Sequence, residues 1–390
     1  MKAFYYISFC YCIFIFSGCN IDKWDLENQS NKLISNYSLT LNTIECKESF
    51  NTNIFPLDKN SFVTAIEGVD RSIKIIKISQ KINGNAWGIV PEIKISQSGD
   101  DLIGFEKSGK YYYLTSASNG KTSVTKIDSS FNTLSSFSSF EQYVDTSYND
   151  ITTVAFQKMV VDTSDGIYLI GQLSSFTKNY SCVIKLNKDL KPIYLKTYFE
   201  NDTIQSLLPL DNDRFIALNQ RLSELSLISD NSDGKQYKKY NLTFNEIFNS
   251  ANLIQSNGKL YLTGVVGSGT GKTIEVSLDK KNAFISDVKN YEVTGMSSYG
   301  ISRNSLLLSG VTKKGSENFG FLAEYKNKEF LWCKTYNDQK YLKSVAINEA
   351  LDVGLIYLFI VENNGRYFIH VLKTDEEGAT LEYPYSSNCL

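Results

Sequence analysis

The sequence of 390 residues is poor in residue types that several chemistries need. It has a single histidine, His370, so a histidine-based triad or zinc site would need other residues in its place. The 40 Lys and Arg residues do not exceed the 42 Asp and Glu residues, and without a basic excess nothing indicates nucleic-acid binding. Prolines number only 5, whereas aromatic residues reach 13%, with 25 Tyr and 23 Phe. Aromatic side chains pack well on pleated surfaces, so this balance favours a strand-rich protein.

The first nineteen residues, MKAFYYISFCYCIFIFSGC, contain one lysine and an apolar run that ends at Phe16. This pattern predicts a secretory signal, because it is too short and too poorly flanked for a transmembrane helix. Phe16-Ser17-Gly18-Cys19 resembles a bacterial lipobox, which implies cleavage before Cys19 and a lipid anchor on that cysteine; an ordinary signal is the alternative. The predicted division is a lipoprotein signal peptide over residues 1–18, a flexible tether over 19–32 and a folded body over 33–390.

The cysteines show no metal-ligand spacing, and we expect no metal site. Export and acylation would leave four of the seven, namely Cys46, Cys182, Cys333 and Cys389. Cys182 and Cys333 lie in apolar strand segments and are predicted to be buried free thiols. Cys46 and Cys389 lie at the two ends of the folded region, where a closed ring would bring the termini together. A disulfide between them is a hypothesis for an oxidising compartment.

Two families of short segments recur along the chain with a shared period. The first is an apolar strand phrase, as in IYLIG and LYLTG, with equivalent positions at Thr64, Leu114, Ile170, Ala217, Thr263, Ser309 and Phe359. The second is an aromatic closing phrase, as in LKTY and CKTY, which ends at Tyr198, Tyr240, Tyr291, Tyr336 and Tyr383. Both families step by roughly 48 residues, which indicates a repeat architecture with seven units.

Each repeat divides into four strands. The third unit shows this best, with strands predicted over residues 151–161, 167–173, 180–186 and 192–198, separated by turns. Four antiparallel strands per unit, with alternating patterning and no amphipathic helix, predict an all-β fold that is a single β-propeller. Seven blades fit the count, with six or eight as alternatives if a terminal unit is irregular. The strand at residues 34–41 is expected to supply the outer strand of the last blade and close the ring.

The order of phrases in the third unit is a DG turn, then IYLIG, VIKLNKDL and IYLKTY. It resembles the repeats of β-propeller lipoproteins common in Bacteroidota, which read DGGYIITG, IKLDxxGNxxW and KTY. The resemblance covers the third to seventh units and is faint in the first two. It implies a location in the cell envelope, as an outer-membrane lipoprotein that faces the periplasm or the surface. Asp202-Thr203-Ile204 is also similar to an O-glycosylation site of such bacteria, which makes Thr203 a candidate for modification.

A glycine-rich segment, GSGTGKT from Gly267 to Thr273, approaches a phosphate-binding loop. The full pattern needs a glycine where Val266 stands, and a helix where residues 273–278 alternate as a strand. We therefore expect a loop between the second and third strands of the fifth blade. The sequence predicts no nucleotide and no other cofactor.

Propellers usually bind at one face, made by the loops between second and third strands and by the connections between blades. We call this the loop face. The candidate binding residues predicted to lie there are Glu67, Asp70, Arg71, Tyr143, Asp145, Tyr148, Asp150, Lys178, Lys272, Lys313, Lys314, Glu317 and Asp338. Mixed charges with exposed tyrosines suit recognition of a protein loop or a sugar. A merely soluble rim is the alternative.

The predicted function is a non-catalytic binding or scaffold module of the cell envelope, held at the membrane through lipid on Cys19. Its partner would be an envelope protein or a glycan, because a propeller fold by itself implies no activity. The alternative is a surface protein that binds or cleaves carbohydrate. A cleaving enzyme would need two facing carboxylates about 5 to 9.5 Å apart. A glycan-binding protein would instead have tyrosines around the channel mouth.

Overall fold

The computed structural model describes residues 37–83, 86–98, 101–138, 140, 151–210, 214–221, 224–230, 237–244, 246–267, 269–278, 283–301, 305–352, 354–380 and 385–386. The predicted signal peptide and tether lie outside these residues. Within the described ranges, no helix has the length and apolar character needed to cross a membrane.

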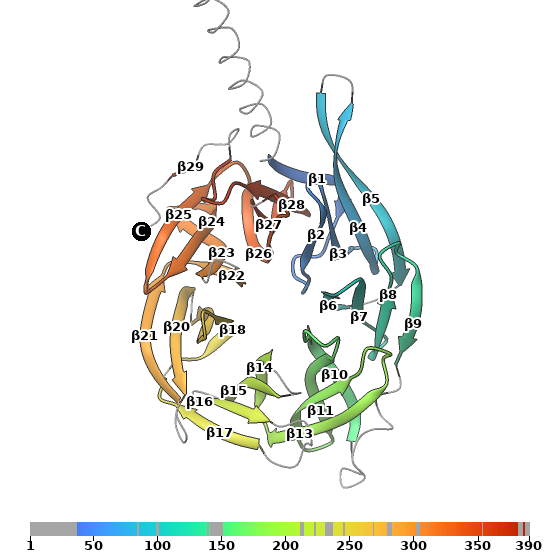
Figure 1. Ribbon diagram of the computed structural model, residues 1–390, viewed down its shortest axis with the longest axis vertical. Coiled ribbons are helices and arrows are strands. Elements are labelled where there is room, and N and C mark those ends of the chain that lie inside the picture. Colours follow the sequence, from blue (N-terminus) through green and yellow to red (C-terminus); the bar gives the residue numbers. More distant parts are fainter. Residues whose placement is uncertain are drawn as a thin grey trace, which may run out of the picture.

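Seven antiparallel sheets stand side by side around a central axis, as predicted, and form a seven-bladed β-propeller (Figure 1). Blade 1 consists of β2 (Ile54–Asp58), β3 (Ser61–Glu67), β4 (Ser72–Asn83) and β5 (Ala86–Ser98). Blade 2 consists of β6 (Asp101–Ser108), β7 (Tyr111–Ser118), β8 (Lys121–Ile127) and β9 (Thr133–Phe137). Blade 3 consists of β10 (Ile151–Val161), β11 (Ile167–Ser175), β12 (Asn179–Leu186) and β13 (Pro192–Glu200). Blades 4 and 5 consist of β14 (Thr203–Pro209), β15 (Phe215–Arg221), β16 (Glu224–Asp230) and β17 (Tyr237–Leu242), and of β18 (Phe248–Ser256), β19 (Lys259–Val266), β20 (Thr270–Leu278) and β21 (Ala283–Tyr291). Blade 6 consists of β22 (Thr294–Ile301), β23 (Ser305–Lys314), β24 (Glu317–Lys326) and β25 (Glu329–Tyr336), and blade 7 of β26 (Lys340–Glu349), β27 (Leu355–Asn363), β28 (Arg366–Thr374) and β1 (Tyr37–Glu45).

The ring is closed by the N-terminal strand. β1 pairs with β28 in antiparallel register, from Tyr37 opposite Lys373 to Thr40 opposite His370 (Figure 1). This confirms that the first strand supplies the outer strand of the last blade. Closure leaves no gap in the ring between the first and the last blade, so no blade face is left exposed there.

A buried histidine lies at this closure. Two hydroxyl groups of β1 lie within hydrogen-bond distance of the His370 ring, Ser38 Oγ at 2.8 Å and Thr40 Oγ1 at 2.9 Å. Asp338 accepts hydrogen bonds from Ser38 Oγ and from the Tyr341 hydroxyl, each at 2.6 Å. Burial lowers the pKa of His370 to about 4, although nearby Asp338 opposes that shift. The lone histidine therefore joins the first strand, β1, to β28 of the last blade as a neutral, hydrogen-bonded side chain.

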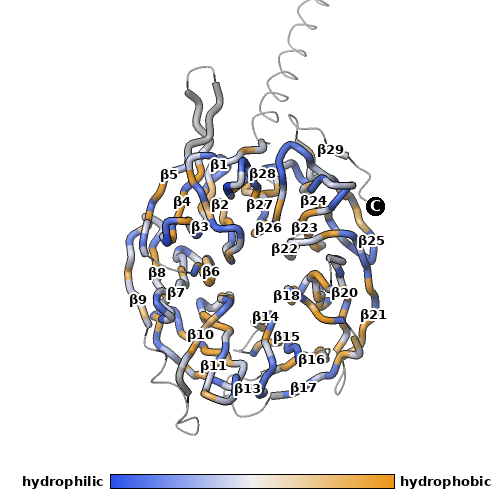
Figure 2. Tube along the Cα trace, turned by 180° about the vertical axis from the view of Figure 1, so that it is seen from behind, coloured by the Kyte–Doolittle hydropathy of each residue, from blue (hydrophilic) through white to orange (hydrophobic). Residues whose placement is uncertain are grey.

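The apolar core lies between neighbouring blades. Between blades 4 and 5, for example, Leu218 and Leu227 pack in one cluster with Leu262 and Ile274. Apolar segments accordingly occur in strands all around the ring (Figure 2). Burial of these faces provides the main stabilisation, at roughly 25 cal/mol per Å² of apolar surface.

At the glycine of the apolar strand phrase, the backbone of the neighbouring inner strand comes so close that a side chain would not fit. In blade 3, a Cβ on Gly171 would lie 2.1 Å from the carbonyl oxygen of Ala155. In blade 5, a Cβ on Gly264 would lie 2.2 Å from the carbonyl oxygen of Ser250. Both sites face an inner strand that bulges, since the pairing of β10 with β11 and of β18 with β19 shifts register there. The repeated glycine thus has a steric cause.

The cysteines correct two predictions and confirm one. Cys182 is a buried free thiol, as predicted. Cys46 is also buried and free, so it forms no disulfide with Cys389, which lies outside the described residues. Cys333 on β25 is disulfide-bonded rather than free. The short strand β29 (Tyr385–Ser386) pairs with β25, so the C-terminal segment adds a fifth strand to blade 6.

Candidate functional site

The inner strands of all seven blades surround a cavity at the centre of the ring. Its volume is about 900 Å³, and its lining comes from the segments that contain or precede β2, β6, β10, β14, β18, β22 and β26. This size lies within the range of roughly 300 to 1,000 Å³ that is usual for small-molecule sites. We call this cavity the central channel.

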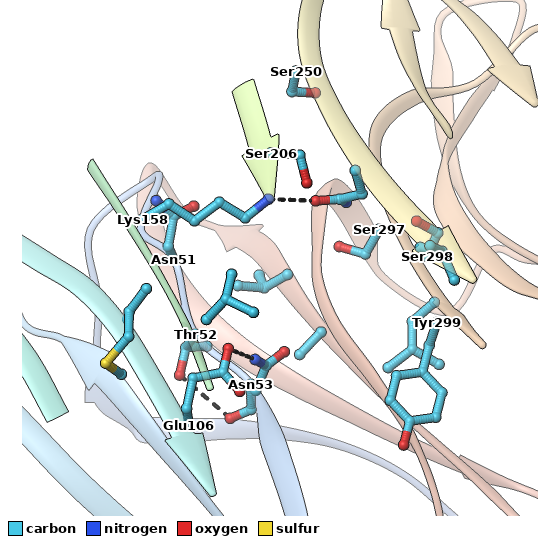
Figure 3. Close-up of a pocket in the computed structure, with 18 of the residues that line it drawn as sticks. Asn51, Thr52, Asn53, Glu106, Lys158, Ser206, Ser250, Ser297, Ser298 and Tyr299 are labelled. Atoms are coloured by element: carbon cyan, nitrogen blue, oxygen red, sulfur yellow. Dashed lines mark hydrogen bonds between the residues drawn. The ribbon is translucent and has the colours of Figure 1, made fainter. Parts of the chain in front are cut away.

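The lining combines apolar side chains with neutral polar ones, several of which are labelled in Figure 3. The polar side chains are amides and hydroxyls, including Asn51, Thr52, Asn53, Ser206, Ser250, Asn252, Ser297, Ser298 and Tyr299. Several of them join one inner strand to the next. Asn348 donates to the Ile54 carbonyl at 2.6 Å, and the Ser206 hydroxyl accepts from the Leu253 amide at 3.0 Å. These hydrogen bonds hold the inner strands in place, and the other polar groups of the lining can still bind a ligand.

A carboxyl group enters the channel from blade 2. Asn53, just before β2, donates its side-chain amide to Glu106 Oε1 on β6 at 2.7 Å. Removal from bulk water raises the pKa of Glu106 to about 8, because the nearby positive charge of Lys158 and the Asn53 hydrogen bond only partly offset that effect. Glu106 therefore holds a proton more readily than an exposed carboxyl group, and in its protonated form it can donate as well as accept a hydrogen bond.

An amine enters from blade 3. Lys158 on β10 extends past blade 4 and donates to Asn252 Oδ1 on β18 at 2.6 Å (Figure 3). Burial lowers the pKa of Lys158 to about 8, an effect that the charge of Glu106 opposes. Lys158 and Glu106 share no ion pair in the described structure, and each is bonded to an amide instead.

Two further lysines contribute to the lining, but their amines are engaged elsewhere. The Lys343 amine donates to Ser49 Oγ at 2.9 Å. The Lys107 amine lies 5.6 Å from the centre of the Tyr112 ring, whose side chain is buried in the blade. Lys158 and Glu106 are thus the two charged side chains best placed to meet a ligand in the channel.

Several of the predicted loop-face residues that the structure describes are held in local contacts. Glu67 is buried, accepts from the Leu102 amide at 2.8 Å and pairs with Lys47, so it anchors blade 1 to blade 2. Asp70 and Arg71 lie in the turn between β3 and β4. Hydrogen bonds from Lys74 and Ser72 hold the pKa of Asp70 at about 2, so this carboxylate stabilises its own turn.

Two of the predicted cations form ion pairs within their blades. Lys178 forms an exposed ion pair with Glu200 at 2.9 Å. Lys272 is buried and pairs with Glu246 at 2.9 Å.

The remaining loop-face predictions divide into three groups. Lys313, Lys314 and Glu317 are exposed around the turn between β23 and β24. Asp338 belongs to the buried closure network around His370. Tyr143, Asp145, Tyr148 and Asp150 lie outside the described residues.

The candidate glycosylation site lies at the start of β14. Thr203 is half-buried and its hydroxyl accepts a long hydrogen bond of 3.4 Å from Gln172. Asp202 is buried and accepts from the Asn219 amide at 2.7 Å. Asp202 therefore has a structural role within blade 4. Modification of Thr203 remains a prediction.

Sequence reasoning missed the channel residues. Glu106, Lys158 and Asn252 all lie on the first strand of a blade, the strand that carries the weakest repeat signal. A usable signal was present, because polar residues interrupt these strands just before each apolar strand phrase. No group of three or more potential metal ligands occurs among the residues that the structure describes.

The fold and the channel define the class of protein as a seven-bladed β-propeller with a polar central cavity. No protein-family model and no curated protein matches the sequence. Among solved structures, a streptogramin B lyase is similar, with a TM-score of 0.50 and 10% identity over 87% of this chain and 99% of the lyase. A polysaccharide lyase gives a TM-score of 0.49 and 8% identity over 87% of this chain and 99% of its own. A protein of unknown function from Bacteroides caccae gives 0.43 and 8% over 72% and 96%. At such low identity, the similarity establishes the fold alone.

Proposed function

We propose that this protein is an exported, lipid-anchored propeller of the cell envelope that binds a glycan in its central channel without cleaving it. The observation that carries this proposal is the lining of the channel, in which neutral amides and hydroxyls lie beside the Lys158 amine and the Glu106 carboxyl group. Sugars present hydroxyl groups that both donate and accept, and such a lining can satisfy them in both roles. Of the tyrosines expected around the channel mouth, the described lining includes only Tyr299, which is half-buried and offers an aromatic surface of the kind that sugar sites use.

Binding is favoured over hydrolysis by the count of carboxyl groups. Glycoside hydrolysis usually requires two carboxyl groups that flank the bond to be cleaved. Among the channel-lining residues that the structure describes, Glu106 is the only one with a carboxyl group. The acidic loop-face candidates do not supply the second, because Glu67 is buried in an ion pair and Asp70 caps a turn.

The envelope location is supported by the N-terminal sequence, where the apolar run and the Phe16-to-Cys19 segment match a lipoprotein signal. Lipid on Cys19 would hold the propeller at a membrane, because each buried methylene group contributes about 0.8 kcal/mol. Labelling of cells with a radioactive fatty acid tests this part, with a Cys19→Ser variant as the control. Incorporation that persists in the variant contradicts the anchor.

The experiment for the channel is a cross-linking pull-down from the native envelope, in which captured glycans and proteins are both identified. Ser250→Trp fills the channel, and Ser136→Trp places the same side chain on the exposed outer strand β9. We expect glycan recovery with the wild-type protein and with Ser136→Trp, and its loss with Ser250→Trp. Equal recovery by the two variants would place the ligand elsewhere. Recovery of one stoichiometric protein partner and no glycan would support a scaffold instead.

A further inference from the structure

We infer that the glycan bound in the channel contains a sugar acid, whose carboxylate pairs with Lys158 while its hydroxyls bind Glu106 and the surrounding amides. This inference rests on the proposed function and specifies the chemical class of the ligand. Its basis is an amine that lines the channel and has no acidic side chain within 4.0 Å among the described residues.

The position of Lys158 requires an explanation. A buried ammonium group normally pairs with a carboxylate, since loss of water around an unpaired charge costs several kcal/mol. Within the described structure, no acidic side chain lies within 4.0 Å of the Lys158 amine. Its hydrogen bond to the neutral Asn252 uses one of three N–H donors, and the charge of Glu106 acts on it only from beyond ion-pair distance. Two donors remain for a ligand.

Glu106 could have compensated this charge, but the structure keeps the two groups apart. The carboxyl group lies on β6 and the amine on β10, which are the inner strands of adjacent blades. Asn53 holds the carboxyl group, and Asn252 holds the amine. Two amides thereby prevent an internal ion pair from forming. A ligand carboxylate that enters between the strands would provide the missing anion.

The lining also selects among anions. Phosphate and sulfate groups are usually bound by several cations or by a fork of arginine N–H groups. The described lining residues include no arginine; the Lys107 amine lies near the Tyr112 ring, and the Lys343 amine donates to Ser49. Lys158 is the lysine of the three whose hydrogen-bond partner, Asn252, also lines the channel, and its single charge matches that of a carboxylate. The remaining amides and hydroxyls match the uncharged hydroxyls of a sugar ring.

Calorimetric titration with matched oligosaccharides tests the inference. The probes are oligomers of glucuronate, galacturonate and mannuronate and sialyl-lactose, each compared with its carboxyl-methylated form, which has the same ring but no charge. We expect the wild-type protein to bind at least one acid about tenfold or more tightly than its methyl ester, as the loss of a charge-assisted hydrogen bond implies. Lys158→Met should remove this preference by weakening binding of the acid, whereas exposed Lys59→Met should retain it.

Several outcomes would overturn the inference. A wild-type protein that binds every ester as tightly as its acid, or that binds none of the probes, has no sugar-acid site. Retention of the acid preference in Lys158→Met would assign the anion to another group. Unchanged affinity of that variant for the ester shows that its channel is intact. Glycan capture blocked by Ser250→Trp, combined with no acid preference, would refute the sugar acid and leave the proposed function standing.

Discussion

The closure of the ring is predicted to weaken as the pH falls below neutrality. His370 has a pKa of about 4 in the folded protein, compared with about 6.5 in an unfolded chain. Above pH 6.5 both states are neutral, and the difference has no effect. Below it, the unfolded chain binds a proton that the folded ring excludes, so the free energy of unfolding falls until the pH reaches the folded pKa.

The magnitude follows from the same two values. A shift of one pKa unit corresponds to 1.36 kcal/mol, so the full effect between pH 7.5 and pH 4 is about 3 kcal/mol. Between pH 7.5 and pH 5, where other groups are less disturbed, the expected loss is about 2 kcal/mol. The buried position of the ring, with only 1% of its surface exposed, justifies the use of the shift without reduction for solvent screening.

Urea unfolding at pH 7.5, 6 and 5 measures this effect, with His370→Gln as the comparison. Other titrating groups change the stability of both proteins alike, so the difference between their curves isolates the histidine. We expect the variant to be less stable than the wild type at pH 7.5 and to lose about 2 kcal/mol less between pH 7.5 and 5. Parallel pH dependences would refute the reasoning, because they would mean that His370 has the same pKa in both states.

Three further predictions follow from the described contacts. Burial raises the pKa of both Cys46 and Cys182 to about 12, so iodoacetamide should modify neither thiol in the native protein and both after unfolding; mass spectrometry showing native labelling would contradict their burial. The raised pKa of Glu106 should make the folded state less stable as the pH rises from about 4.5 to about 8, and Glu106→Gln should flatten this decline in urea midpoints; an unchanged slope would mean that the carboxyl group ionises normally. Gly264→Ala should cost about 1 to 3 kcal/mol of stability in urea unfolding, because its Cβ would meet the Ser250 carbonyl; an unchanged midpoint would show that the bulge can relax.

The architecture could be predicted from the sequence because each blade repeats the same order of strands and the same pattern of buried residues. Apolar strand phrases such as residues 167–171 occupy the buried second strand, and the period between them gives the blade count. The closing tyrosines are equally informative. Tyr291, for example, is buried at the end of β21 and stacks on Phe321 of the next blade. Such signals depend on the order of apolar and polar residues within short segments, which a single sequence shows directly.

The candidate site could not be predicted in the same way. Lys158 and Asn252 are 94 residues apart, and only the curvature of the ring brings them together across the channel. Register shifts in the inner strands, such as the one between Phe156 and Lys158, also change which residues face inward. The alternation of side chains along a regular strand therefore does not identify which residues of the inner strands face the channel. The loop-face prediction failed to anticipate local pairing, since Glu67 and Lys272 are both used within the fold.

The closing strand also determines how the molecule would respond to tension. β1 is the described segment nearest the N-terminus, and it lies antiparallel along β28. A pull transmitted from a membrane through the N-terminal residues would act first on the hydrogen bonds between these two strands, before it reached any other blade. Ser38 and Thr40 place the His370 network at that point of loading. We expect the ring to open at blade 7 under force, and acidic conditions to lower the force required.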